Sequence, residues 1–321
     1  MFTHTAIRDA LQAVNEHESA VATILAVDAG TNHSYRITFE DGSRRLLKVG
    51  TRFPDAFPAE PKTMAVLGER TDIPVPQVYG MGESPLGYPF AVYEFVPSAD
   101  ADDGRVSDLP PAAAEQLCRE AGENLGALHR ETLPAFGPVG VDGDGFVVTD
   151  EMPFREMLRG SLDRQLSLLR ETPFSGRCEA LGELSEELIE RIDSEALRPA
   201  LAHGDYRLEN LAVDPTAEQV TSAVLDWERP TATDPLWDAV MAKALLTAGY
   251  GLDEEFRRSL EATFWDAYGD GASGTARRAC YELLARVRLA RHLDEEVGGE
   301  SATAVSARVR EHERAFDRLL A

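Results

Sequence analysis

The apolar residues of the first hundred positions follow first a helical and then an alternating pattern. Residues 4–17 carry apolar side chains at helical spacing, which predicts an amphipathic helix. Short runs rich in β-branched and aromatic residues come next and predict strands over 21–27, 34–39, 45–49, 76–80 and 89–95. A helix that begins near residue 60 interrupts this series, with a proline in its first turn.

Helical spacing dominates beyond residue 111. It predicts helices over 111–130, 153–171, 178–195, 234–248, 253–267, 273–297 and 302–320. The stretch 136–150, between the first two of these helices, is rich in glycine and is expected to be extended. Residues 97–111 are acidic and interrupted by proline and glycine, which is typical of a linker. The sequence therefore predicts an α+β chain of two lobes, a small β-rich lobe over 1–97 and a larger, mainly helical lobe over 98–321.

Two short apolar segments in the larger lobe each run into a polar loop. The first leads to His203, Asp205 and Asn210, and the second, 223–225, leads to Asp226. The spacing H-x-D-x-x-x-x-N is that of a phosphoryl-transfer loop, whose Asp serves as base and whose Asn binds metal. Asp226 supplies a second oxygen ligand of the kind that Mg²⁺ prefers. An Asp and an Asn in one loop would alone indicate only a turn, but the complete set predicts phosphoryl transfer.

A family resemblance extends this interpretation. The chain resembles the aminoglycoside phosphotransferase and choline kinase family, in particular its broad phosphotransferase enzyme branch, over His203-Gly204-Asp205-Tyr206-Arg207-Leu208-Glu209-Asn210, Leu225-Asp226-Trp227-Glu228, Asp234-Pro235 and Asp238. The resemblance implies a two-lobed protein-kinase-like fold and ATP-dependent phosphorylation of a small-molecule hydroxyl. It also implies that Asp205 is the catalytic base and that Asn210 and Asp226 are magnesium ligands. His203 would support the loop, and Asp238 would brace it as a buried acceptor from the next helix.

The N-terminal strands offer a site for the nucleotide. Lys48 lies on the third predicted strand, where the kinase template has a lysine that contacts the phosphates and pairs with a glutamate of the next helix. Glu60, early in that helix, is the expected partner, and Glu69 is the second choice. Alone, Lys48 would be an ordinary strand lysine and Glu60 an acid favoured by the helix dipole. Their order along the chain predicts an ATP contact.

Two further nucleotide contacts are predicted from position in the chain. The turn between the first two strands contains Thr31 and Asn32 and would lie over the ATP phosphates, where backbone N–H groups bind oxyanions. A plain hairpin turn fits the same residues. The backbone of Glu94 and Val96, at the end of the fifth strand, is expected to bind adenine at the hinge between the lobes. This second expectation rests on chain order and on the family resemblance.

The arginines near the predicted site receive two different interpretations. Arg207 follows Asp205 by two residues, and we expect it to stabilise the charge of the transferring phosphoryl group. One predicted helix also carries a basic cluster of Arg286, Arg288, Arg291 and His292. That cluster is more typical of a solvated or carboxylate-pairing helix face than of a site.

The charge balance limits the partners that this chain can have. It contains 321 residues, with 56 acidic against 32 basic side chains, a net charge of −24 and only three lysines. Nucleic-acid binding needs clustered lysine and arginine, so the composition argues against that class of partner. Such a composition is typical of adaptation to high salt, where screening weakens the repulsion among carboxylates. An acidic protein from a GC-rich genome would share it.

Several other kinds of site have no support in the sequence. The sequence contains three cysteines, Cys118, Cys178 and Cys280. They are far apart and indicate neither a zinc cluster nor a disulfide framework. The N-terminus lacks a basic segment followed by an apolar one, and no apolar run is long enough to span a bilayer. We therefore expect a cytoplasmic, soluble monomer or homodimer without a membrane partner.

The combined expectation is a kinase that uses ATP and Mg²⁺ and phosphorylates a small hydroxylated acceptor, such as an amino alcohol, a sugar or an amino sugar. The alternative is a catalytically idle nucleotide-binding regulator on the same fold. The presence of Lys48, Asp205, Asn210 and Asp226 argues against the regulator, because a binding module has no need of a base. Nucleotidyl transfer would use similar ligands and stays open.

Overall fold

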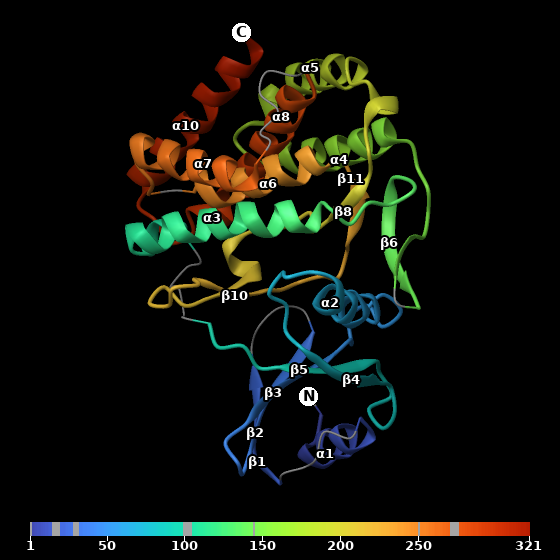
Figure 1. Ribbon diagram of the computed structural model, residues 1–321. Helices are drawn as coiled ribbons and strands as arrows, with labels where there is room; N and C mark the ends of the chain where they lie inside the picture. Colours follow the sequence, from blue (N-terminus) through green and yellow to red (C-terminus); the bar gives the residue numbers. More distant parts are fainter. Residues whose placement is uncertain are drawn as a thin grey trace.

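The N-terminal part of the molecule is an antiparallel sheet. The computed structural model describes residues 2–14, 20–27, 32–98, 105–143, 145–249, 251–269 and 276–321. Five strands pair in the order β1-β2-β3-β5-β4 and lie at the bottom of the molecule in Figure 1. They are β1 (Val21–Val27), β2 (His33–Phe39), β3 (Arg44–Val49), β4 (Val78–Gly82) and β5 (Phe90–Glu94).

The two faces of this sheet pack against different parts of the chain. Along β5, Phe90 and Val92 pack in a cluster with helix α1 (His4–Ala13). Ala91 and Tyr93 belong instead to a core shared with helix α2 (Ala59–Arg70) and with the C-terminal helices. Successive side chains of a strand point to opposite faces, so this alternation means that both faces are covered. The sheet is thereby joined to the rest of the molecule through α2.

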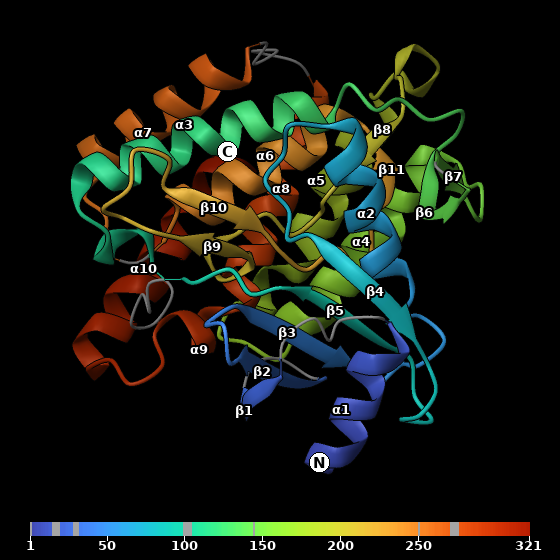
Figure 2. The same ribbon diagram turned by 60° about the horizontal axis from the view of Figure 1, so that its bottom comes forward.

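The C-terminal part is mainly helical. Its helices are α3 (Pro111–Leu128), α4 (Phe154–Leu169), α5 (Cys178–Glu190), α6 (Pro235–Thr247), α7 (Glu254–Tyr268), α8 (Ala276–Arg291), α9 (Leu293–Glu296) and α10 (Ala302–Leu320). One small sheet has the order β7-β6-β11-β8, from β6 (Gly137–Asp142), β7 (Gly145–Val148), β8 (Ala200–Ala202) and β11 (Thr231–Thr233). A separate pair, β9 (Leu211–Val213) and β10 (Thr221–Val224), lies between the helices and the N-terminal sheet (Figures 1 and 2).

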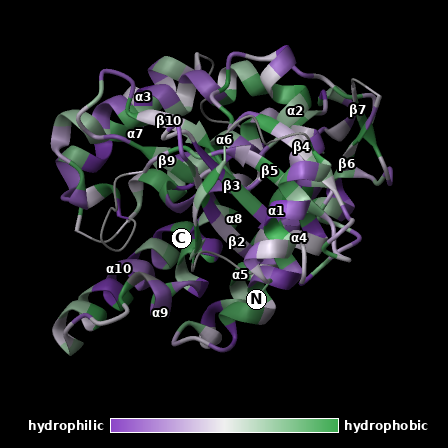
Figure 3. Ribbon diagram, turned by 90° about the horizontal axis from the view of Figure 1, so that it is seen from below, coloured by the Kyte–Doolittle hydropathy of each residue, from purple (hydrophilic) through white to green (hydrophobic). Residues whose placement is uncertain are grey.

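Helix α6 occupies the centre of this helical part. One set of its side chains, including Ala239 and Leu246, packs in the core formed with α3 and α7. Another set, including Val240 and Met241, packs in the core formed with α4, α5 and α8. The outer helices are amphipathic and mix hydrophobic and hydrophilic residues around their axes (Figure 3). None of the helices in the described ranges is long and apolar enough to cross a membrane.

The predicted α+β class is confirmed, whereas one predicted helix is wrong. The continuous helix expected over 273–297 is broken, because the amide of His292 bonds the carbonyl of Leu289, three residues back, and ends α8. The short helix α9 then begins at Leu293. Residues 273–275 of that prediction, and 15–17 of the first predicted helix, lie outside the described residues. The extended stretch predicted at 136–150 contains the β6–β7 hairpin.

The domain boundary predicted near residue 97 stays a prediction. Residues 99–104 of the predicted linker lie outside the described part of the chain. On either side of it, Tyr93 and Leu117 contribute to one hydrophobic core. The two predicted lobes therefore share buried surface.

The close approach of α3 and α7 leads to a stability prediction. A Cβ atom at Gly122 would lie 2.5 Å from the carbonyl oxygen of Phe264 and 2.8 Å from the amide nitrogen of Tyr268. Gly122→Ala should therefore destabilise the fold by about 2 kcal/mol, because the backbones must separate. The control is Gly160→Ala, at an exposed position of α4 where a Cβ meets nothing within 4 Å. It should stabilise by about 0.5–1 kcal/mol through helix propensity. Urea unfolding of both variants tests this, and equal midpoints would contradict the proposed packing.

Candidate functional site

The predicted site residues are brought together by the β9–β10 pair. Asn210 lies at the end of a single helical turn that leads into β9, and Val224 of β10 pairs with Leu211 of β9. The amide of Leu225 then bonds the carbonyl of Asn210 at 2.8 Å. Asp226, one residue further, is consequently delivered next to the loop that carries Asn210. Two segments that are separate in the sequence thus form one polar site.

His203 connects these two segments through its ring. Its Nε2 lies 2.8 Å from the carbonyl oxygen of Leu225, and its Nδ1 accepts the backbone amide of Asp205 at 3.2 Å. One donating and one accepting nitrogen is the pattern of a neutral imidazole. The ring of Trp227 packs edge-on against His203 with a centroid distance of 4.5 Å. These contacts suit the supporting role predicted for His203.

Asp238, in the first turn of α6, holds the start of the same loop. Its carboxylate accepts the amides of His203 at 3.0 Å and Gly204 at 2.8 Å, and Nε2 of His129 lies 3.3 Å away. Burial by itself would raise the pKa of Asp238, but the contact with His129 and the bond from Gly204 outweigh it and lower that pKa. Gly204 has φ +77°, a conformation that glycine adopts without strain. The loop is therefore fixed to the central helix.

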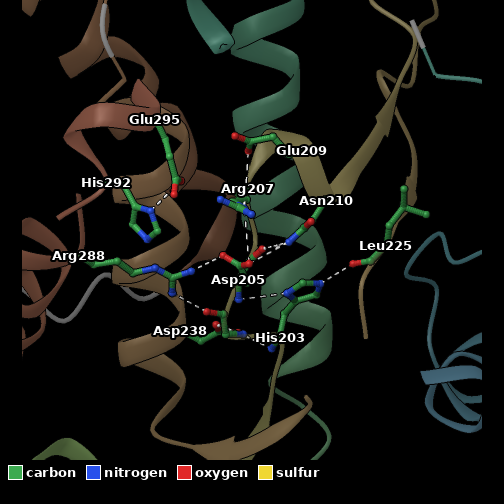
Figure 4. Close-up of polar contacts among 11 residues, drawn as sticks. His203, Asp205, Arg207, Glu209, Asn210, Leu225, Asp238, Arg288, His292 and Glu295 are labelled. Carbon is green, nitrogen blue, oxygen red and sulfur yellow. Dashed lines mark hydrogen bonds and ion pairs between the residues drawn. The ribbon is translucent and has the colours of Figure 1, made fainter. Parts of the chain in front are cut away.

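Asp205, the predicted base, lies in a ring of donors and remains 31% exposed. Its Oδ2 is 3.2 Å from Nδ2 of Asn210 and 3.4 Å from Nε of Arg207. Its Oδ1 accepts a hydrogen bond from Arg288 of α8, which approaches from the side opposite to Leu225 (Figure 4). The carboxylate is thus oriented by three side chains yet still accessible to a substrate.

The predicted nucleotide side contains the expected ion pair. Nζ of Lys48 lies 2.7 Å from Oε2 of Glu60 and 3.2 Å from Oε1 of Glu228. Burial alone would lower the pKa of Lys48, but the two carboxylates raise it above its ordinary value. The same Glu228 oxygen accepts from Nδ2 of Asn32 at 3.3 Å. Lys48 is therefore a charged, positioned amine, whereas the second choice Glu69 is exposed on α2.

Asp226 has the properties of a cation ligand. It is the one non-glycine residue with positive φ, 63°, in the described ranges. Burial raises its pKa, and the nearby carboxylate of Glu228 raises it further. Within those ranges its carboxylate has no hydrogen bond or ion pair, and Oδ1 of Asn210 accepts none. A free carboxylate and a free carboxamide oxygen, with other carboxylates nearby, fit the hard-oxygen preference of Mg²⁺.

The protein by itself offers few ligands for such a metal. Among the described residues, no group of three or more His, Cys, Asp or Glu side chains is close enough to hold one. Magnesium commonly takes one or two protein oxygens and completes its shell with water and substrate phosphates. The pair Asn210 and Asp226 is sufficient on that basis.

The remaining predicted nucleotide contacts are the hinge residues at and after the end of β5 and the turn before β2. Glu94 ends β5, and its amide bonds the carbonyl of Gln77 at 2.8 Å. Val96 follows two residues later, where the chain leaves the sheet. Thr31 lies outside the described residues, although its neighbour Asn32 reaches Glu228 near Lys48. The hinge and turn contacts therefore stay predictions.

Two residues at the site were missed by the sequence reasoning. Glu228 follows Asp226 by two residues and has no role predicted from the sequence, but its carboxylate accepts hydrogen bonds from Lys48 and Asn32. Arg288 was grouped with a solvated or carboxylate-pairing face, and the carboxylate that it pairs with is that of Asp205. No local pattern connects a helix near residue 288 with a loop 83 residues earlier.

Comparison with known proteins places the chain in a family. The model of the "Phosphotransferase enzyme family" matches residues 23–283. A structure from Ralstonia eutropha JMP134, named as an aminoglycoside phosphotransferase, superimposes with a TM-score of 0.68 at 21% identity, over 100% of this chain and 98% of that one. The ternary complex of aminoglycoside phosphotransferase APH(4)-Ia with ADP and hygromycin B gives 0.61 at 15% identity, over 97% of each chain. These likenesses show a two-lobed kinase-like fold.

A curated relative shares only part of its length with this chain. Acyl-CoA dehydrogenase family member 10 of Mus musculus is 28% identical over 234 residues, which is 69% of this chain. The chain spans only 20% of that relative's length. The similarity therefore concerns one region of a longer protein.

The strained, repelled carboxylate of Asp226 predicts that its removal stabilises the free protein. A raised pKa means that the folded state binds the proton more tightly than the unfolded state, so this group destabilises the fold increasingly as pH rises above about 4. At neutral pH, Asp226→Asn should raise the unfolding midpoint by about 2 °C, and the gain should vanish near pH 4. Asparagine also tolerates positive φ.

The control for this measurement is Asp214→Asn. Hydrogen bonds from the side chain and amide of Thr216 lower the pKa of Asp214, so the same change should not stabilise the protein. Thermal unfolding from about pH 4 to pH 8 compares the three proteins. A lower midpoint for Asp226→Asn at neutral pH would contradict the repulsion argument.

Proposed function

Because the chain belongs to the phosphotransferase enzyme family, we propose that it is a small-molecule kinase that transfers the γ-phosphoryl group of ATP to a hydroxyl. The observation that carries the proposal is the convergence of Asp205, Asn210 and Asp226 in one polar site. The Lys48–Glu60 pair joins β3 to α2, and Lys48 and Asp205 each interact electrostatically with Asp226. This arrangement matches the parts that phosphoryl transfer requires.

Asp205 orients the acceptor hydroxyl and takes its proton. Its exposed carboxylate is held in place by Asn210 and Arg288, so little reorganisation is needed when the acceptor arrives. As the hydroxyl oxygen bonds to the γ-phosphorus, the bond from that phosphorus to the ADP oxygen breaks. The hydroxyl proton passes to Asp205 and then to solvent. The products are ADP and a phosphate ester.

The nucleotide is held from the sheet side. The ammonium of Lys48, kept charged by Glu60 and Glu228, contacts the phosphates. Asn32, which reaches Glu228 beside Lys48, contacts the phosphates, and the backbone of Glu94 and Val96 receives the adenine. Asn210 and Asp226 would hold magnesium, which would neutralise charge on the phosphates when bound. That contribution matters because the chain itself has a net charge of −24.

In this proposal Arg207 stabilises the transferring group. Its Nε lies 3.4 Å from Asp205 and 3.8 Å from Glu209, so the guanidinium stays beside the base. Negative charge on the equatorial oxygens of the phosphoryl group would be adjacent to it during transfer.

The same residues provide the test that separates a kinase from an idle nucleotide-binding regulator. ADP release is measured with Mg²⁺–ATP in about 2–3 M KCl against a panel of sugars, amino alcohols, hydroxy acids and aminoglycosides. We expect turnover that depends on an acceptor and falls by about 10³-fold or more in Asp205→Asn. ATP binding without turnover in both proteins would favour the regulator, and a product containing the nucleotide would indicate nucleotidyl transfer.

A second measurement tests Arg207. Arg207→Ala should lower kcat by about tenfold or more, with little change in the KM for ATP, because its charge acts mainly during transfer. Arg207→Lys should recover part of the loss, since lysine restores the positive charge but lacks the planar guanidinium group. A loss of less than about threefold in Arg207→Ala would refute this role.

A further inference from the structure

A basic surface faces Asp205 from the C-terminal end of α8. Arg288, Arg291 and His292 lie three and four residues apart and share one side of the helix end, and we call them the α8 patch. Arg288 reaches Asp205 from this side, whereas Leu225, which precedes the proposed magnesium ligand, lies across from it (Figure 4). An in-line acceptor approaches the γ-phosphorus from the side away from the leaving group. The α8 patch is therefore on the acceptor side.

The α8 patch has hydrogen-bond donors that the protein leaves unused. The Nη atoms of Arg288 donate to the carbonyl of Gly204, at 2.9 Å, and to Asp205, but its Nε–H is buried without an acceptor. The Nε–H of Arg291 is also buried and unpaired, and Arg291 has no hydrogen bond or ion pair with any described residue. Buried donors normally have partners. Two orphan guanidinium donors on one helix face indicate a missing acceptor group.

The electrostatics of the α8 patch agree with a missing anion. Burial lowers the pKa of Arg291, and the charge of Arg288 lowers it further. Burial and then the charge of Arg291 likewise lower the pKa of His292. The basic side chains of the α8 patch thus repel one another, although the chain has 56 acidic and only 32 basic residues. The carboxylate of Glu295 is already bonded to Nδ1 of His292 at 2.8 Å. Arg291 thus remains available to a ligand.

We propose that the α8 patch binds an oxyanion of the acceptor, a carboxylate or a phosphate, and so places the acceptor hydroxyl at Asp205. Arg291 and the Nε–H of Arg288 are the donors to that oxyanion. The proposal rests on the kinase function proposed above and narrows its acceptor to hydroxyl compounds that carry a negative group. Polycationic acceptors such as aminoglycosides are disfavoured, because they would meet like charges next to the base.

The first test compares acceptors that share one carbon skeleton. D-glycerate and glycerol 3-phosphate carry an oxyanion, glycerol is neutral, and 3-amino-1,2-propanediol is a cation. ATP-dependent ADP release with wild-type protein should give a kcat/KM at least about tenfold higher for one of the two anionic acceptors than for glycerol or the amine. The comparison of glycerate with glycerol phosphate decides between a carboxylate and a phosphate. Preference for the neutral or cationic compound would overturn the proposal.

The second test needs no turnover. Malonate and inorganic phosphate are titrated into protein saturated with Mg²⁺–ADP, so that the nucleotide phosphates already occupy their site. Arg291→Ala should weaken binding of the anion by about tenfold or more, and Arg291→Lys should be intermediate. Arg286→Ala is the control, since Arg286 lies on the opposite side of α8 and contacts His312. It should bind like wild type.

The outcomes separate this proposal from the kinase proposal. Anion binding that is absent, or that Arg291→Ala and Arg286→Ala leave equally unchanged, overturns the role of the α8 patch whether or not turnover occurs. A raised KM for ATP in Arg291→Ala, with the acceptor KM unchanged, overturns it too, since the patch would then serve the nucleotide. Arg291-dependent anion binding together with no turnover on any acceptor would support the α8 patch and refute the kinase function.

Discussion

One buried carboxylate holds the loop of the candidate site to the framework of the molecule. Asp238 lies on the central helix α6 and accepts the amides of His203 and Gly204. A buried charge must keep its hydrogen-bond donors, because losing them leaves an uncompensated ion in a low-dielectric interior. The loop therefore cannot shift relative to α6 without a large cost. The position of Asp205 follows from this constraint, since it is the next residue after Gly204.

Three of the basic side chains of this acidic chain lie at the candidate site. Lys48, one of only three lysines, faces the nucleotide side, while Arg207 and Arg288 flank Asp205. Near Asp226 the carboxylates repel one another, which would favour the metal cation proposed there. The site thus contains a cationic and an anionic half, as the joint binding of a polyanion and its metal requires.

The local parts of this arrangement were predictable from the sequence. The strand–turn pattern and the helix after the third strand place Lys48 and Glu60 twelve residues apart on neighbouring elements, and they form the expected pair. The spacing from His203 to Asn210 likewise lies within one loop. The end of α8 was not predictable from the sequence, because the helical spacing of apolar residues continues past His292. In the structure, the amide of His292 bonds the carbonyl of Leu289, three residues back, and the helix ends there.

The sequence by itself determined the α+β class, the order of elements and the residues of the loop, because these follow from short-range periodicity and from motif spacing. Only the tertiary structure decided which distant groups meet them. Glu228 reaches Lys48 across 180 positions, and Arg288 reaches Asp205 across 83. Those contacts depend on how α8 packs against α6 and on how β10 lies between the helices and the N-terminal sheet. Pairing over such separations is set by the packing of whole elements and leaves no local pattern in the chain.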